Sequence, residues 1–149
     1  MAESEFMIGQ LARRTGCKVQ TIRYYEQIGL MPEPVRTQGN QRRYAARHLG
    51  RLAFIRHSRE MGFSLESIRE LLDLADDPAR SCETADRIAQ AQLREVESRI
   101  VRLRALKSEL KRMIVQCQGG RASECRVIEV LADHSQCLID NHQTPLDRS

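Results

Sequence analysis

The residues from about Thr84 to Gln116 form one long helical pattern, which constrains the fold more than any other part of this 149-residue chain. Its apolar positions advance by alternating steps of three and four residues, the spacing of a coiled-coil seam of about three heptads. A lone helix of this kind would expose an apolar stripe, so the pattern predicts pairing with a second chain. The seam positions are Leu93, Val96, Ile100, Leu103, Leu110, Ile114 and Cys117, with the charged Lys107 among them.

Cysteines flank this helical pattern: Cys82 precedes it, Cys117 ends it and Cys125 follows in a polar loop. At about 1.5 Å per residue, an intact helix would separate Cys82 from Cys117 by roughly 52 Å. One protomer therefore cannot bring both thiols to one ion, whereas two antiparallel helices place the start of one beside the end of the other. The spacing predicts a homodimer with two shared thiolate sites.

Composition excludes several classes of protein. Apolar residues make up 41% and charged residues 30% of the chain, as in soluble helical proteins, and no apolar run approaches the ~18 residues that cross a membrane. The N-terminus lacks the features of a signal peptide, so we expect a cytoplasmic protein. Five cysteines, an odd number in that setting, indicate thiol or metal chemistry rather than a disulfide framework. No catalytic motif is present, and an enzyme is not expected.

Positive charge is concentrated near the N-terminus. The segment from Arg13 to Arg59 contains eleven lysines and arginines but two acidic residues, Glu26 and Glu33, although the whole chain carries a formal charge of only +4. A compact basic segment is the electrostatic footprint of a nucleic-acid-binding module.

The same segment has the pattern of a winged helix-turn-helix. Helical spacing over Met7–Thr15 and Val19–Ile28 is interrupted by Gly16-Cys17, and Gly39-Asn40 favours a β-hairpin turn within residues 35–44. Further helices are predicted over Arg47–Met61 and after Ser64. The predicted fold is mainly all-α: a DNA-binding domain with a small hairpin wing over residues 6–76, a linker and dimerisation helix over 77–117, and a metal-binding loop, short helix and tail over 118–149.

The expected DNA contacts lie on the second helix, on the wing and on the helix that follows it. Thr21 and Arg23 are expected to face a groove, while the wing arginines hold the backbone, because phosphate contacts position a protein and base contacts specify it. The full set is Lys18, Gln20, Thr21, Arg23, Tyr24, Arg36, Arg42, Arg43, Tyr44 and Arg56.

Three thiolates suit a soft or borderline cation such as Zn, Cd, Pb or Hg. A divalent ion leaves such a site at −1, whereas a monovalent ion leaves −2, which is costly away from water. A fourth ligand could come from His134, Cys137, His142 or a water molecule, and an ion that prefers three thiolates needs none.

Four stretches of this sequence resemble the MerR family of bacterial transcription regulators, over roughly residues 7–117. They are IGQLA at 8–12, TIRYYEQIGL at 21–30, RTQGNQRRY at 36–44 and LAFIR at 52–56. The cysteines further resemble the divalent-metal branch of that family, because Cys82 occupies a position where copper sensors typically carry serine. Cys117 and Cys125 match the two cysteines of the family's metal-binding loop.

This resemblance implies a dimer on an antiparallel coiled coil that binds a two-fold symmetric operator in promoter DNA. It also implies that a metal ion shared between Cys82 of one protomer and Cys117 and Cys125 of the other makes the dimer distort the DNA. RNA polymerase then engages the promoter of metal efflux or resistance genes.

Three other interpretations stay open at this point. The eight-residue step from Cys117 to Cys125 also fits the loop of a Cu(I) sensor. The same two thiols could form a disulfide and act as a redox switch. The chain could also be an architectural DNA-binding protein without an effector.

Overall fold

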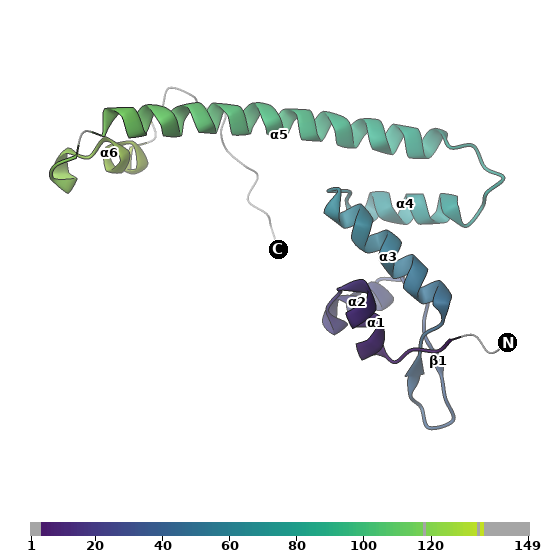
Figure 1. Cartoon of the computed structure of the whole chain (residues 1–149). Coiled ribbons are helices and arrows are strands. Elements are labelled where there is room, and N and C mark those ends of the chain that lie inside the picture. Colours follow the sequence, from purple (N-terminus) through teal and green to yellow (C-terminus); the bar gives the residue numbers. More distant parts are fainter. Residues whose placement is uncertain (1–3, 118, 134, 136–149) are drawn as a thin grey trace. The chain divides into compact units, whose positions relative to one another are not determined.

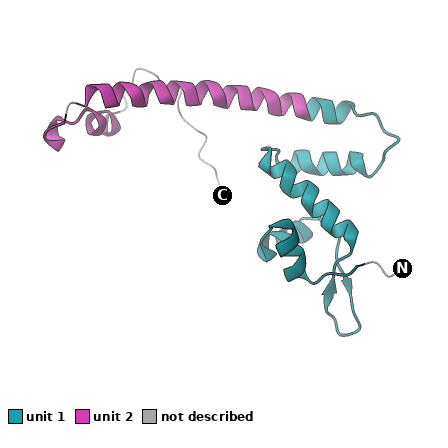
Figure 2. Cartoon of the chain, viewed as in Figure 1, with its two compact units in different colours: residues 1–88 teal, residues 89–149 magenta. Residues whose placement is uncertain are grey.

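The computed structural model describes residues 4–117, 119–133 and 135. The chain divides into two compact units, residues 1–88 and 89–149 (Figure 2). The predicted class is confirmed: helices dominate, and the described residues contain a single two-stranded sheet (Figure 1). The predicted domain boundary after residue 76 stays a prediction. No helix of the described residues is both long enough and apolar enough to span a bilayer.

The first unit begins with α1 (Ile8–Thr15) and α2 (Val19–Gln27), the two helices expected for a helix-turn-helix. Gly16 lies between them with φ of +69°, and a Cβ there would collide with the guanidinium of Arg56. The positive φ favours glycine at this turn, because glycine adopts this backbone conformation without strain. Cys17, the next residue, packs against the core of the unit.

The wing follows as β1 (Val35–Arg36) and β2 (Arg42–Arg43), paired antiparallel with Val35 opposite Arg43 (Figure 1). Asn40 adopts a left-handed backbone with φ of 60°, and its N–H donates to the Thr37 carbonyl at 2.9 Å. The expected hairpin turn is thus confirmed. Asparagine tolerates this conformation better than most residues, which explains why the turn falls here.

Two further helices complete the first unit, α3 (Ala46–Glu60) and α4 (Leu65–Ala75). Ser64 caps α4 by accepting a hydrogen bond from the Ser67 N–H at 3.1 Å, as its position predicts. Apolar side chains from every helix meet in one core, so α2 and the wing are carried on a rigid support. The most buried members are Leu11, Ile22, Leu30, Met31, Tyr44, Leu52, Ile55 and Ile68.

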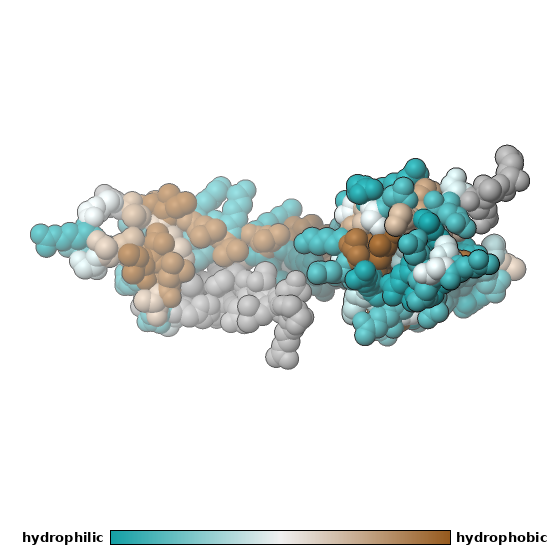
Figure 3. Space-filling model, turned by 90° about the horizontal axis from the view of Figure 1, so that it is seen from below, coloured by the Kyte–Doolittle hydropathy of each residue, from teal (hydrophilic) through white to brown (hydrophobic). Residues whose placement is uncertain are grey.

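The long helix α5 (Glu83–Gln116) has 34 residues and crosses from the first unit into the second. Its predicted seam side chains are exposed in the single chain, with Leu103 at 57% and Ile114 at 68%. Figure 3 shows apolar side chains gathered over the α5–α6 unit. This exposure is large for a helix of a soluble protein, and an apolar stripe of this kind is typical of an interface.

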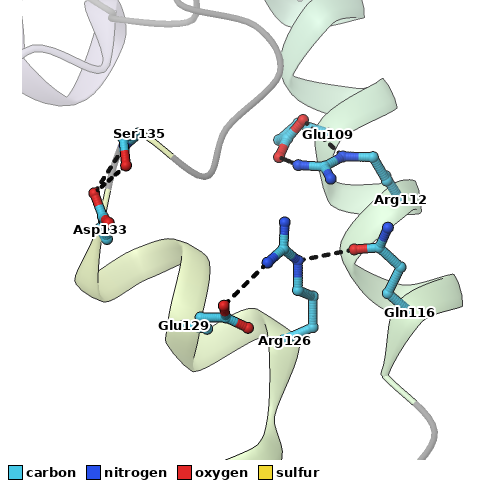
Figure 4. A network of polar contacts seen from close by, with 7 residues as sticks. All are labelled: Glu109, Arg112, Gln116, Arg126, Glu129, Asp133 and Ser135. Atoms are coloured by element: carbon cyan, nitrogen blue, oxygen red, sulfur yellow. Dashed lines mark hydrogen bonds and ion pairs between the residues drawn. The ribbon is translucent and has the colours of Figure 1, made fainter.

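A short 3₁₀ turn, η1 (Ala122–Glu124), and a final helix, α6 (Arg126–Ala132), follow α5. The short helix predicted within residues 118–149 is thus present as α6. Arg126 joins the two helices, because its Nε donates to Gln116 Oε1 at 2.9 Å and its Nη1 lies 3.3 Å from Glu129 Oε1 (Figure 4). On α5, the nearly buried Glu109 pairs with Arg112. The loop from α5 to α6 is therefore held at both ends.

Candidate DNA-binding surface and thiol pair

The polar face of α2 is available to a partner. Ile22 and Tyr25 are buried in the core and fix the orientation of the helix, so the residues between and before them point outward. Tyr24 is 48% exposed. The predicted contact residues on this helix are all solvent-accessible: Lys18, Gln20, Arg23 and Tyr24 are exposed, and Thr21 is half-buried.

The wing presents its arginines close to α2. Arg36 donates from Nη1 to Asn40 Oδ1 at 3.1 Å, which stiffens the hairpin, while Arg42 and Arg43 are half-buried on β2. A depression of about 220 Å³ separates the wing from α2. Its lining combines cationic and anionic groups: Arg23, Glu26, Gln27, Glu33, Pro34, Arg36 and Arg42.

Tyr44 is fully buried, which corrects the expectation that it holds DNA phosphate. Its hydroxyl donates to Glu26 Oε1 at 2.5 Å, and its ring meets His48 edge-on at 5.4 Å between centroids. Burial raises the pKa of Tyr44 to about 12, and the hydrogen bond to Glu26 acts in the same direction. Tyr44 is therefore a neutral hydrogen-bond donor that holds Glu26 of α2 from within the core.

Arg56 is engaged by protein groups. Its Nη1 donates to the carbonyl of Thr15 at the end of α1, and its Nε lies 3.1 Å from Glu60 Oε1. A cation at this position suits the negative end of the helix dipole. Arg56 thus supports the turn before α2, and its predicted phosphate contact stays a prediction.

The second candidate site is a pair of thiols in the second unit. Cys117 directly follows α5, and Cys125 is the N-cap residue of α6. The backbone N–H of Ile128 is the main cause that lowers the pKa of Cys125, and the N–H of Val127 and the Cys117 thiol act in the same direction. Neighbouring hydrogen-bond donors favour the thiolate, which is the form that binds metals.

Of the other predicted metal ligands, Cys82 is the one that the structure describes. Cys82 is exposed and lies in the first unit, just before α5. Among the residues that the structure describes, no three His, Cys, Asp or Glu side chains cluster in a way that could hold a metal ion. His134, Cys137 and His142 lie outside the described residues.

The contacts of two residues, Glu26 and Arg126, do not follow from the sequence. Glu26 counted only as one of the few acids in a basic segment, yet it joins α2 to the wing. Arg126 likewise gave no signal beyond its place at a helix start. Arg42 and Tyr44 are two residues apart, the spacing at which side chains of extended backbone lie on the same side, and both contact Glu26.

Comparisons with known proteins agree with this architecture. The model of the MerR HTH family regulatory protein matches residues 6–75, and that of the MerR DNA-binding region matches residues 49–113. The chain is similar to the HTH-type transcriptional regulator ZntR of Escherichia coli (strain K12), with 43% identity over 129 residues that cover 85% of this chain and 92% of that protein.

Two further relatives extend the similarity. The HTH-type transcriptional regulator CueR of Vibrio cholerae (serotype O1, classical strain) is 33% identical over 138 residues, covering 93% of this chain and 99% of its own length. The crystal structure of the transcription regulator PbrR691 from Ralstonia metallidurans CH34 in complex with lead(II) matches with a TM-score of 0.72 and 40% identity, covering 85% and 99% of the two chains. The chain therefore belongs to the MerR family of helix-turn-helix regulatory proteins.

Proposed function

We propose that this protein is a metal-responsive transcription regulator that binds a two-fold symmetric promoter operator as a homodimer. The observation that carries the proposal is the Cys117–Cys125 pair, with its stabilised thiolate, in a chain that also presents a basic winged helix-turn-helix. The similarity to a lead(II)-bound regulator adds support. The protein acts in the cytoplasm, where its promoter DNA lies.

The donor chemistry of the thiol pair fits a soft or borderline ion. Thiolate sulfur prefers Zn, Cd, Pb or Hg over Mg or Ca, which take oxygen ligands. Two donors from one chain leave the site incomplete, and the exposed Cys82 of the partner subunit is the proposed third ligand. When bound, the ion supplies a link between protomers that changes the geometry of the dimer on DNA.

A dimer linked by the metal ion in this way can change transcription from the promoter. We propose that the metal-bound dimer distorts the operator so that RNA polymerase engages both promoter elements, and that the controlled genes remove or resist the metal. The DNA contacts are Lys18, Gln20, Thr21, Arg23 and Tyr24 on α2 and Arg36, Arg42 and Arg43 on the wing.

The experiment that tests this function is transcription in vitro from the operator-containing promoter with purified RNA polymerase. Zn(II), Cd(II), Pb(II), Hg(II) and Cu(I) are each added under reducing conditions to the wild-type protein and to Cys82→Ser. We expect one or more divalent ions to activate the wild type and not the variant. Activation by Cu(I) that survives in Cys82→Ser would favour the copper interpretation, and absence of any metal response would overturn the proposal.

The salt dependence of binding tests the wing. Arg43→Ala is expected to weaken operator binding and to reduce the slope of log Kobs against log salt concentration by about 1.8, because each of the two protomers loses one phosphate contact. Arg121→Ala removes the same charge from the loop of the second unit and is the matched control. Equal slopes for Arg43→Ala and wild type would contradict this assignment.

A further inference from the structure

Glu26 is a nearly buried carboxylate within the most basic segment of the chain. Its side chain is only 9% exposed, although it lies on the helix that we propose to enter DNA. A negative charge at this place repels phosphate and weakens binding to any DNA. Glu26 must therefore contribute a favourable effect that offsets its repulsion of phosphate.

Both carboxylate oxygens of Glu26 are used. Oε1 accepts the hydroxyl hydrogen of Tyr44 at 2.5 Å, and Oε2 accepts from Nη1 of Arg42 at 3.1 Å. Bonds of this kind, with an ionised acceptor, are about twice as strong as bonds between neutral groups. One side chain on α2 therefore holds two side chains of the segment that forms the wing.

The Tyr44 end of this arrangement is anchored in the core. Its backbone N–H and C=O pair with Phe6 at 2.9 and 2.8 Å, and its ring is fully buried. The Arg42 end is different, because that side chain is 35% exposed and lines the depression between α2 and the wing. Glu26 thus ties a half-buried cation, one of the proposed DNA contacts, to a buried anchor.

We propose that Glu26 is a positioning residue for sequence-specific binding, which fixes the wing and its Arg42 at the distance from α2 that the operator requires. The inference rests on the proposed binding of DNA by α2 and the wing. A fixed spacing strengthens binding only to a duplex that α2 and the wing can contact at the same time. On other DNA, the protein binds through charge alone, so the fixed spacing between α2 and the wing adds no affinity.

The test compares Glu26→Gln with wild type on two duplexes, one selected by the wild-type protein from a random pool and one scrambled. Glutamine keeps an acceptor for Tyr44 but loses the charge that holds Arg42. We expect roughly tenfold weaker binding to the selected duplex, on the scale of a lost charge-assisted bond. Binding to the scrambled duplex should stay the same or tighten, since a repulsive charge is gone. A merely destabilised protein would lose affinity for both duplexes.

Glu33→Gln is the matched control. Glu33 lines the same depression, and the change removes an equal charge. Among the described residues, however, its polar contact is made by the backbone carbonyl, with His48 Nε2 at 3.3 Å. The ratio of the two affinities should not change in this variant. If Glu26→Gln likewise leaves the ratio unchanged, or if both duplexes lose affinity equally, the positioning role is wrong.

Arg42→Gln supplies an independent variant at the exposed end of the pair. If Glu26 acts through Arg42, adding Glu26→Gln to Arg42→Gln should produce no further fall in the affinity ratio, whereas independent roles would make the two losses multiply. A wild-type protein that selects no duplex would instead overturn the proposed function itself, which keeps the two failures distinguishable.

Discussion

A heterodimer of one Cys82→Ser chain and one Cys125→Ser chain is expected to bind one metal ion tightly, although neither variant does so as a homodimer. In a shared site, the Cys125→Ser chain still supplies Cys82, and the Cys82→Ser chain still supplies Cys117 and Cys125. One complete three-thiolate site is therefore restored. If all three ligands came from one chain, no chain in this mixture would have a complete set.

A second heterodimer provides the opposite test of the shared site. A heterodimer of wild type with the Cys82→Ser, Cys125→Ser double variant contains the same number of cysteines, but each shared site then lacks at least one ligand. It should bind no ion tightly, whereas ligands from a single chain would give one complete site. Two affinity tags isolate each heterodimer, and titration with Cd(II), followed by the thiolate-to-metal absorption band, counts the sites. Opposite stoichiometries would refute the shared site.

Leu103→Glu is expected to convert the dimer to a monomer at working concentrations and to abolish operator binding. Leu103 lies in the middle of the seam and is 57% exposed in the single chain. Each dimer would lose two buried leucines, each worth about 1.5–3 kcal/mol, so the dissociation constant should rise on the order of 1000-fold. A monomer can contact only one half of a symmetric operator.

The control for this variant is Val101→Glu, which places the same charge on an equally exposed apolar residue of α5, at 62%, outside the seam. Analytical ultracentrifugation gives the association state of both proteins, and gel shifts give their operator binding. A Leu103→Glu protein that remains dimeric, or a Val101→Glu protein that dissociates equally, would mean that the seam is not the interface.

The sequence predicted the helices well because their signals are local. The spacing of three and four residues gave α1, α2 and α5, Ser64 marked the start of α4, and Gly39-Asn40 marked the hairpin. Each signal lies within a few residues of the feature that it predicts, so no knowledge of the tertiary structure was needed.

The polar contacts were harder to predict, because they join residues far apart in the chain. Glu26 meets Arg42 and Tyr44, which lie 16 and 18 residues away, and no pattern in either segment specifies such a pair. The position of Tyr44 directly after two arginines of the wing suggests a DNA contact. Tyr44 instead lies just after β2 in a bridge with Phe6, a residue far away in the chain that no local pattern specifies.

The hydrogen bond between Arg126 and Gln116 has a consequence for how an ion is captured and exchanged. By joining the start of α6 to the end of α5, it holds the two ends of the loop that carries Cys117 and Cys125 before any ligand arrives. Capture by one thiol then makes the second contact intramolecular, so the local concentration of the second sulfur is far above that of any free thiol in solution. A chelating pair of this kind also retains its ion while one bond is broken, which allows a third sulfur from another chain to replace a competing small-molecule thiol stepwise.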